Sequence, residues 1–295
     1  MHSIFKRFTN LILTLFGVVT TVFFLFNILP GDPAQMMLDQ NEDSKQIEIV
    51  KKKYGFDKPV FVQYLYYLND LSPFSIHFKE IKNISNLNSK KYTYFKLFSL
   101  KMVDIVIKIP YLRESYQKKG VKVSEVIRNT LPNTIVLAIA SISIAIFLGL
   151  FLGIFSALNK DTWFDYSVQF FSTLGMSVPS FFSAIVFAWL FGFVLHEFTG
   201  LNMTGSLYEL DDYGENFQIN LKNIILPAFV LGIRPVAVIS QIMRNSLLNV
   251  LSQNYIRTAY SKGLSKFVII RDHALKNSLS PVVTTLSGWF ASLMA

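Results

Sequence analysis

The residues able to do covalent chemistry in this 295-residue sequence are few and scattered. The absence of cysteine excludes disulfides, thiolate zinc sites and thiol nucleophiles. The sequence contains no G-x-x-x-x-G-K-[ST] phosphate loop, no H-E-x-x-H zinc motif and no G-x-S-x-G nucleophile motif. We therefore expect no catalytic residue, no metal site and no ATP-binding site in this chain. The histidines, which we expect to be solvated or structural, are His2, His77, His196 and His273.

One charged residue, Arg234, lies near the middle of an apolar run at 224–243. A charge at that depth in a membrane costs about 3 kcal/mol or more and usually faces a cavity. Two roles are open for it. Arg234 lines a translocation path, to which Pro179 in the S-V-P-S segment also contributes, or it makes a structural bond to a neighbouring helix or backbone carbonyl.

The most informative polar segment is 251–281, between two apolar runs. Residues 248–262 are compatible with a helix, and Gly263 stands where a left-handed residue would end it. Ser265 is suited to cap a second helix, and Pro281 is expected to begin the next apolar span. Two short helices joined at a glycine corner would present a rigid knob to a cytoplasmic partner. An ordinary amphipathic connector is the alternative.

Composition places these residues in a membrane protein. Hydrophobic residues make up 52% of the chain and charged residues only 16%, whereas a soluble domain carries about a quarter charged residues. Pro132 is expected in the first turn of its helix, and Pro179 is expected to break a run too long for one straight crossing. The predicted spans are 11–29, 130–159, 166–195, 224–243 and a short fifth that begins at Pro281 and runs to the end, which suggests truncation.

Charge distribution predicts the topology. The link at 197–215 is acidic and the segment at 244–276 is basic, which places the basic segment and the N-terminus in the cytoplasm. The first span is predicted to be uncleaved, because residues 27–31 offer no signal-peptidase site. The net charge of +9 is attributed to orientation and lipid headgroups, with no nucleic-acid partner.

A polar loop of about 100 residues, 30–129, follows the first span. It is rich in lysine, but loops longer than about 60 residues escape the positive-inside rule, so an extracytoplasmic position is predicted. Helices are expected at 48–54 and 60–71. The lysine- and asparagine-rich stretch at 72–110 is either a small outer subdomain or a mobile insertion.

The segment at 251–281 resembles the cytoplasmic coupling loop of ABC importer permeases. Only Ala259, Gly263 and Leu275 match the general form of that loop, but 254–264 (N-Y-I-R-T-A-Y-S-K-G-L) and 273–277 (H-A-L-K-N) are similar to the dipeptide/oligopeptide/nickel branch. The resemblance assigns coupling to the ATPase to a set of nine residues. These are Tyr255, Arg257, Thr258, Ala259, Lys262, Gly263, Leu264, His273 and Leu275.

Other segments carry the same resemblance: 54–59 (Y-G-F-D-K-P), 131–134 (L-P-N-T) and 177–181 (S-V-P-S-F). A further one, L-P-G-D-P at 29–33, resembles the branch's signature after span one. Its residues either turn the chain out of the membrane or contact a gate or binding protein. They are Pro30, Gly31, Asp32 and Pro33.

The resemblance implies an all-α integral membrane protein, a type I ABC importer permease bundle with a large extracytoplasmic loop. Its parts would be a first span (1–29), the loop (30–129, with an insertion at 72–110) and a permease core (130–295) with a coupling loop at 248–280. A family member has six spans, of which five begin here. It sits in the bacterial inner or plasma membrane and is not itself an enzyme.

The implied partners are a second homologous permease, two cytoplasmic ATPases that hold ATP and Mg, an extracytoplasmic substrate-binding protein and membrane lipid. The implied cargo is peptides or similar small solutes, with nickel, glutathione or sugars as alternatives. An ion-coupled secondary transporter would want acidic or histidine relays inside the spans, where Arg234 is nearly alone. A polytopic membrane enzyme would need a nucleophile or metal cluster, and none is visible.

Overall fold

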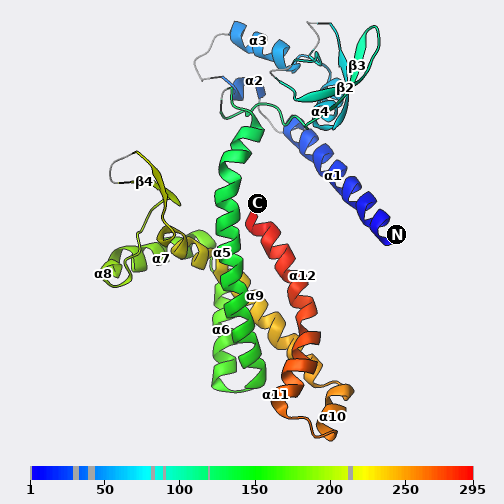
Figure 1. Cartoon of the computed structure of the whole chain (residues 1–295). Helices are drawn as coiled ribbons and strands as arrows, with labels where there is room; N and C mark the ends of the chain where they lie inside the picture. The colour runs from blue at the N-terminus through cyan, green and yellow to red at the C-terminus, as the bar shows by residue number, and fades with distance from the viewer. Residues whose placement is uncertain are drawn as a thin grey trace. The chain divides into compact units, whose positions relative to one another are not determined.

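Figure 1 shows the computed structural model, which describes residues 2–28, 33–38, 44–80, 84–88, 91–118, 120–211 and 215–294. Pro30, Gly31 and Asp32 lie outside these residues. The chain divides into two compact units, Met1–Asn129 and Thr130–Ala295. Each is described by itself.

The first unit holds four helices and a small sheet. The helices are α1 (His2–Ile28), α2 (Pro33–Met36), α3 (Ser44–Tyr54) and α4 (Val60–Leu71). Strands β1 (Phe74–Phe78), β2 (Tyr94–Ser99) and β3 (Val103–Lys108) form an antiparallel sheet in the order β1-β3-β2. The helices expected at 48–54 and 60–71 are therefore confirmed. The sheet lies within 72–110, the stretch predicted to be either a small outer subdomain or a mobile insertion.

That stretch, 72–110, is joined to the rest of its unit through a buried carboxylate. Asp70, at the end of α4, is 6% exposed. It accepts hydrogen bonds from the Tyr92 hydroxyl at 2.7 Å and from Arg113 Nε at 2.9 Å. The Lys108 ammonium donates to the Asp70 carbonyl oxygen at 2.7 Å. Since both Tyr92 and Lys108 belong to the stretch, its described part forms a folded subdomain, the first of the two alternatives.

The second unit is a bundle built on two long helices, α5 (Val123–Leu158, which starts at the end of the first unit) and α9 (Lys222–Leu251). Its other helical segments are α6 (Trp163–Ser177), α7 (Ser180–Trp189), η1 (Leu190–Val194), α8 (His196–Thr199), α10 (Asn254–Ser261), α11 (Lys266–Val268), η2 (Ile269–Ala274) and α12 (Leu275–Met294). A hairpin of β4 (Tyr208–Leu210) and β5 (Phe217–Ile219) lies between α8 and α9.

Small residues let α5 and α9 approach closely. A Cβ added at Gly149 would lie 2.8 Å from Ile239, and one at Gly153 would lie 2.6 Å from the Ser240 carbonyl oxygen. The other side of α5 turns large apolar groups outward, with Phe147 73% exposed. Small residues inside and bulky apolar residues outside are typical of helices packed in lipid, where close backbone contact replaces the hydrophobic effect.

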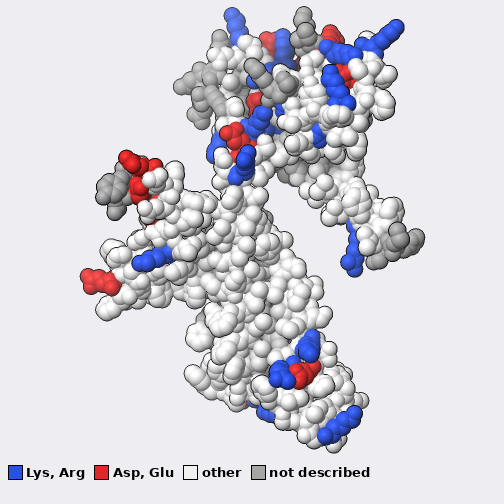
Figure 2. Space-filling model, in the orientation of Figure 1, with Lys and Arg blue, Asp and Glu red and all other residues white. Residues whose placement is uncertain are grey.

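Three of the described helices are long and apolar enough to cross a membrane: Ile4–Asn27 within α1, α5 and α9. The pair α6 and α7-η1 makes a fourth if it counts as one span, and it is bent by 107° at Val178-Pro179. The break predicted at Pro179 is thus present. In the second unit, Figure 2 shows Lys and Arg gathered at the end that carries α10 and α11, and a middle without charge on this face.

Some sequence expectations require correction. Helix α5 begins at Val123, so Pro132 lies inside it and not in its first turn. Pro281 lies inside α12, which begins at Leu275, and α12 is not among the three candidate spans found in the described helices. The expected all-α membrane fold is confirmed, and the loops add two small sheets to it.

The buried ammonium of Lys108 makes the stability of the first unit depend on pH. Lys108 is 4% exposed, and burial lowers its pKa to about 8. The unfolded chain therefore binds more protons above pH 8, so the free energy of unfolding should rise with pH between 8 and 10.5. Above about pH 10 the buried tyrosines oppose this rise, since burial raises the pKa of Tyr92 and Tyr111.

We expect protection of a cysteine introduced at the buried Val106 position (V106C) to increase about tenfold from pH 7 to pH 9 through Lys108 alone. The measurement is the thiol-labelling rate, divided at each pH by the rate for an exposed K101C control. The chain has no cysteine of its own to interfere. A V106C/K108M variant should lose the increase, and an unchanged pH dependence in that variant would contradict the assignment to Lys108.

Candidate functional site

The site lies where the chain leaves α9 and turns back through α10 into α12, at the lower end of the second unit in Figure 1. Sequence reasoning predicted one helix over 248–262. Instead α9 ends at Leu251, Gln253 is extended with ψ 149°, and α10 starts at Asn254. Within α10, Ile256 and Ala259 are buried, because residues three apart share one helical face.

Gly263 forms the corner after α10. Its φ is +78°, a left-handed conformation that glycine adopts without strain. A Cβ at this position would meet nothing within 4 Å, so backbone conformation alone selects glycine. The Ser265 hydroxyl then accepts a hydrogen bond from the Val268 amide at 3.4 Å and caps the helical run from Lys266 onward. The corner and the cap predicted from the sequence are both confirmed.

The two halves of the motif pack against each other. Ile256 and Ala259 of α10 belong to one buried cluster with Ile269, Ala274 and Val282. The Asn277 side-chain amide also donates to the Tyr255 hydroxyl at 2.8 Å, across 22 residues. The spacing between 254–264 and 273–277 is therefore needed for the two segments to pack against each other within this chain.

This packing changes the interpretation of Ala259. A surface contact with the ATPase was expected, but Ala259 is 7% exposed and is buried among residues of its own chain. The structure also partly buries His273 and Leu275. These three residues shape the knob, and the surface left for a partner is formed by the exposed members of the set with Tyr260 and Phe267 beside them. The exposed members are Tyr255, Arg257, Thr258, Lys262, Gly263 and Leu264.

An ion pair that the sequence analysis missed supports this knob. Asp165 of α6 is fully buried and accepts hydrogen bonds from Nε and Nη2 of Arg244 in α9, each at 2.6 Å. The Ser156 hydroxyl at the end of α5 and the Asp161 amide also donate to this carboxylate. Arg244 lies about two turns before the end of α9 at Leu251, so this pair fixes the end of α9 to the α5–α6 turn. Arg234 is therefore not nearly alone as a buried charge. The sequence did offer one signal for this pair: Asp165 is an acidic residue in the first turn of α6, directly after the short polar link at 159–161.

Arg234 and Pro179 lie at the same place in the fold. Arg234 Nη2 donates to the carbonyl oxygen of Val178, directly before Pro179, at 3.3 Å, while the buried Arg234 Nε has no hydrogen-bond partner among the described residues. The bent α6–α7 junction leaves carbonyl groups without their helical partners, and the guanidinium satisfies one of them. A bond to a backbone carbonyl, one of the two roles considered, is thus present.

The structure says little about the signature residues that follow span one. Pro30, Gly31 and Asp32 lie outside the described residues, and Pro33 is the first residue of α2. Their role stays a prediction.

Together, the lipid-type helix packing, the uncharged middle and the cornered knob define a polytopic membrane protein of the transport-permease class. The family described as binding-protein-dependent transport system inner membrane component matches residues 149–295, and the family of its N-terminal region matches residues 1–81. The chain belongs to this family of ABC importer permeases and is a multi-pass protein of the bacterial inner membrane.

Individual relatives align along almost the whole chain. A peptide transport system permease protein of Brucella suis is 30% identical over 291 residues, 99% of this chain and 78% of that protein. A dipeptide transport system permease protein of Alkalihalophilus pseudofirmus is 29% identical over 295 residues, 95% of this chain and 77% of that protein. An oligopeptide transport system permease protein of Bacillus subtilis is 28% identical over 285 residues, 95% of this chain and 76% of that protein.

Breaking the Asp165–Arg244 pair should strongly destabilise the second unit. We expect Asp165→Asn or Arg244→Gln to cost about 3–5 kcal/mol, because each leaves a buried charge without its partner. The double variant should recover part of this loss. Unfolding in detergent can be followed by the fluorescence of Trp163, two residues from Asp165. Lys160→Gln is the control, since its ion pair with Asp161 is exposed and should matter by less than about 1 kcal/mol. Equal effects of Arg244→Gln and Lys160→Gln would refute the structural role of the pair.

Arg234 allows the path role to be separated from the structural role. If the side chain lines the translocation path, Arg234→Leu should leave the protein inserted and assembled but reduce uptake by about tenfold or more, an estimate from the cost of an intramembrane charge. Arg234→Lys, which keeps the charge and a donor, is the matched control. Uptake into proteoliposomes and recovery of the assembled complex are the two measurements. Unchanged uptake would reject the path role, and loss of assembly would leave only the structural one.

Proposed function

We propose that this chain is one of two homologous permease subunits in an importer that takes up peptides. The family defines a component of a binding-protein-dependent system, which implies partner ATPases and a substrate-binding protein. Peptides are proposed as cargo because the relatives carry dipeptide, di/tripeptide and oligopeptide transport names. No observation on this chain favours nickel, glutathione or sugars.

The observation that carries the mechanism is the cornered knob. Its exposed face includes Arg257, Lys262 and Leu264, while its inner face is fixed to α9 and α12 through one buried cluster. A rigid knob of this kind transmits a push from a cytoplasmic partner to the spans behind it. We propose that two ATPases, which hold ATP and Mg, receive the knob in a groove and that their closure switches the permease between outward and inward access.

The Asp165–Arg244 pair gives this movement a route into the bundle. Arg244 precedes the knob on α9, and Asp165 lies at the start of α6, which leads to the break at Pro179. Displacement of the knob would therefore move α9 and α6 together. Arg234 joins the same two helices at the other end of α6, through the Val178 carbonyl oxygen. This arrangement supports a rigid-body transition and not a local loop movement.

Strain at the corner tests the coupling role. Gly263→Val places a β-branched residue in a left-handed conformation at a cost of about 1–2 kcal/mol, and should turn α11 away from its position. We expect the permease to reach the membrane, while ATP hydrolysis by the reconstituted complex loses its stimulation by the loaded binding protein. Gly200→Val is a matched control, since Gly200 has a φ of +61°, equally open space around it and a position outside the knob.

A second change separates docking from strain. Leu264→Asp puts a charge on an exposed side chain of the knob, so folding should be unaffected while co-purification of the ATPase falls several-fold. Ile219→Asp, at an exposed apolar residue of β5, is the control. Normal ATPase recovery and normal stimulation in both Gly263→Val and Leu264→Asp would mean that the segment is only a connector.

A further inference from the structure

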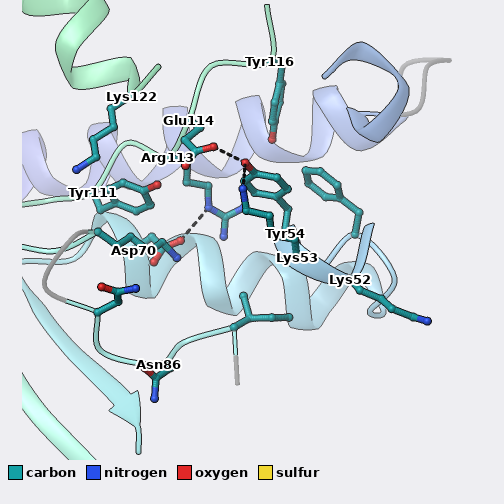
Figure 3. A pocket seen from close by; sticks show the side chains of 14 residues that line it. Lys52, Lys53, Tyr54, Asp70, Asn86, Tyr111, Arg113, Glu114, Tyr116 and Lys122 are labelled. Atoms are coloured by element: carbon teal, nitrogen blue, oxygen red, sulfur yellow. Dashed lines mark hydrogen bonds and ion pairs between the residues drawn. The ribbon is translucent and has the colours of Figure 1, made fainter. Parts of the chain in front are cut away.

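A pocket of about 480 Å³ is lined only by residues of the first unit. Its walls come from the end of α3, the end of α4, the segment after β1 and the segment that follows β3 (Figure 3). The size is within the range of pockets that hold small ligands. Neither the coupling role nor the membrane spans account for it.

The lining is strongly cationic. Five lining residues carry a positive charge and two carry a negative charge, which leaves an excess of three. Both carboxylates are already engaged: Asp70 accepts from Arg113 and Tyr92, and Glu114 accepts from the Tyr54 hydroxyl. The cations are Lys52, Lys53, Lys91, Arg113 and Lys122.

Lys91 is the least compensated of these cations. Its side chain is partly buried. Its backbone amide donates to the Asn88 carbonyl oxygen, but its ammonium makes no hydrogen bond or ion pair with the described residues. Its ammonium lies 4.9 Å and 5.0 Å from the ring centroids of Tyr92 and Tyr111. Burial lowers the pKa of Lys91, which means that its surroundings disfavour the charged form. An anion bound in the pocket would supply the missing compensation.

The remaining polar groups suit an anion made of oxygen atoms. Burial raises the pKa of Tyr111 and Tyr116, so these hydroxyls stay protonated and can donate to a ligand, whereas the Tyr54 proton is already donated to Glu114. Arg113 has a left-handed φ of +64°, a strained conformation that is concentrated at binding sites. In Figure 3 its guanidinium lies between Asp70 and Tyr54, whereas Lys52 points away.

We propose that this pocket is a binding site for a small oxyanion with at least two negative charges, either a polycarboxylate or a phosphate. Lys53, Lys91, Arg113 and Lys122 provide the charge, and the tyrosine hydroxyls provide directional hydrogen bonds. A ligand of this chemistry would also join α3 to the segment after β3, because it bridges groups from both. The sequence predicts that this unit faces the outside of the cell, so the ligand would be an external one.

The test uses the full chain in nanodiscs of neutral lipid, at fixed ionic strength, with citrate and inorganic phosphate as the two probes in calorimetric titrations. We expect saturable 1:1 binding of at least one probe, and the stronger of the two identifies the source as carboxylate or phosphate. Lys91→Met keeps the side-chain length but not the charge, and should weaken that binding at least tenfold. Lys101→Gln, at an exposed lysine outside the pocket, should leave it unchanged.

Lys91→Met could disturb the packing of Tyr92 and Tyr111, so Lys53→Gln, at an exposed position, is the second variant and should also weaken binding. Cysteine protection at V106C checks that each variant is folded. Binding of neither probe up to millimolar concentration would overturn the proposal. Equal binding by the folded Lys91→Met, Lys53→Gln and Lys101→Gln variants would overturn it as well.

Discussion

The interaction on which the second unit depends is the buried ion pair between Asp165 and Arg244. It connects three helical segments, since Ser156 at the end of α5 donates to the same carboxylate. A buried pair contributes little net stability compared with apolar packing, but it tolerates only one arrangement, because either charge alone in the interior is strongly unfavourable. The pair therefore fixes the position of α9 just before the chain turns into the knob. The orientation of the knob relative to the bundle follows from this constraint.

The same principle operates at the break between α6 and α7. A bent helix leaves carbonyl groups without their helical partners, and inside a membrane each such group must be satisfied within the protein or by water in a cavity. Arg234 reaches the Val178 carbonyl oxygen and satisfies one of them, while its Nε remains without a partner among the described residues. This unused donor is itself buried, so a solute would reach the guanidinium only after the surrounding side chains move. A transport role for this side chain would therefore require such a movement in addition to the structural bond.

The first unit solves the burial problem differently. Its centre holds Asp70, Tyr92 and Lys108 in a hydrogen-bonded group, together with Arg113 at its edge. Polar groups of this kind specify one arrangement of strands and helices only if all are satisfied. The lining of the adjacent pocket holds more cationic than anionic side chains, and the Lys91 ammonium is the one on which the proposed anion site depends. Folding and the proposed anion site therefore share the residues Asp70 and Arg113.

The sequence by itself determined the features that depend on local backbone chemistry. The long apolar runs, the break at Pro179, the corner at Gly263 and the cap at Ser265 all follow from residue type and position, because proline, glycine and serine act on their own neighbours. The start of α5 was missed by several residues, because the helix begins at Val123 and continues through Pro132.

Only the tertiary structure decided which residues meet. Asp165 and Arg244 are 79 residues apart, and Asp70 meets Lys108 across 38. Neither contact produces a periodic pattern in the sequence, because a charged residue is predicted to be solvent-exposed unless its partner is known. Ala259 was assigned outward for the same reason: a small residue on a short amphipathic helix fits either a partner or its own core. The fold places it inward, since Ala274 of η2 and Val282 of α12 belong to the same buried cluster.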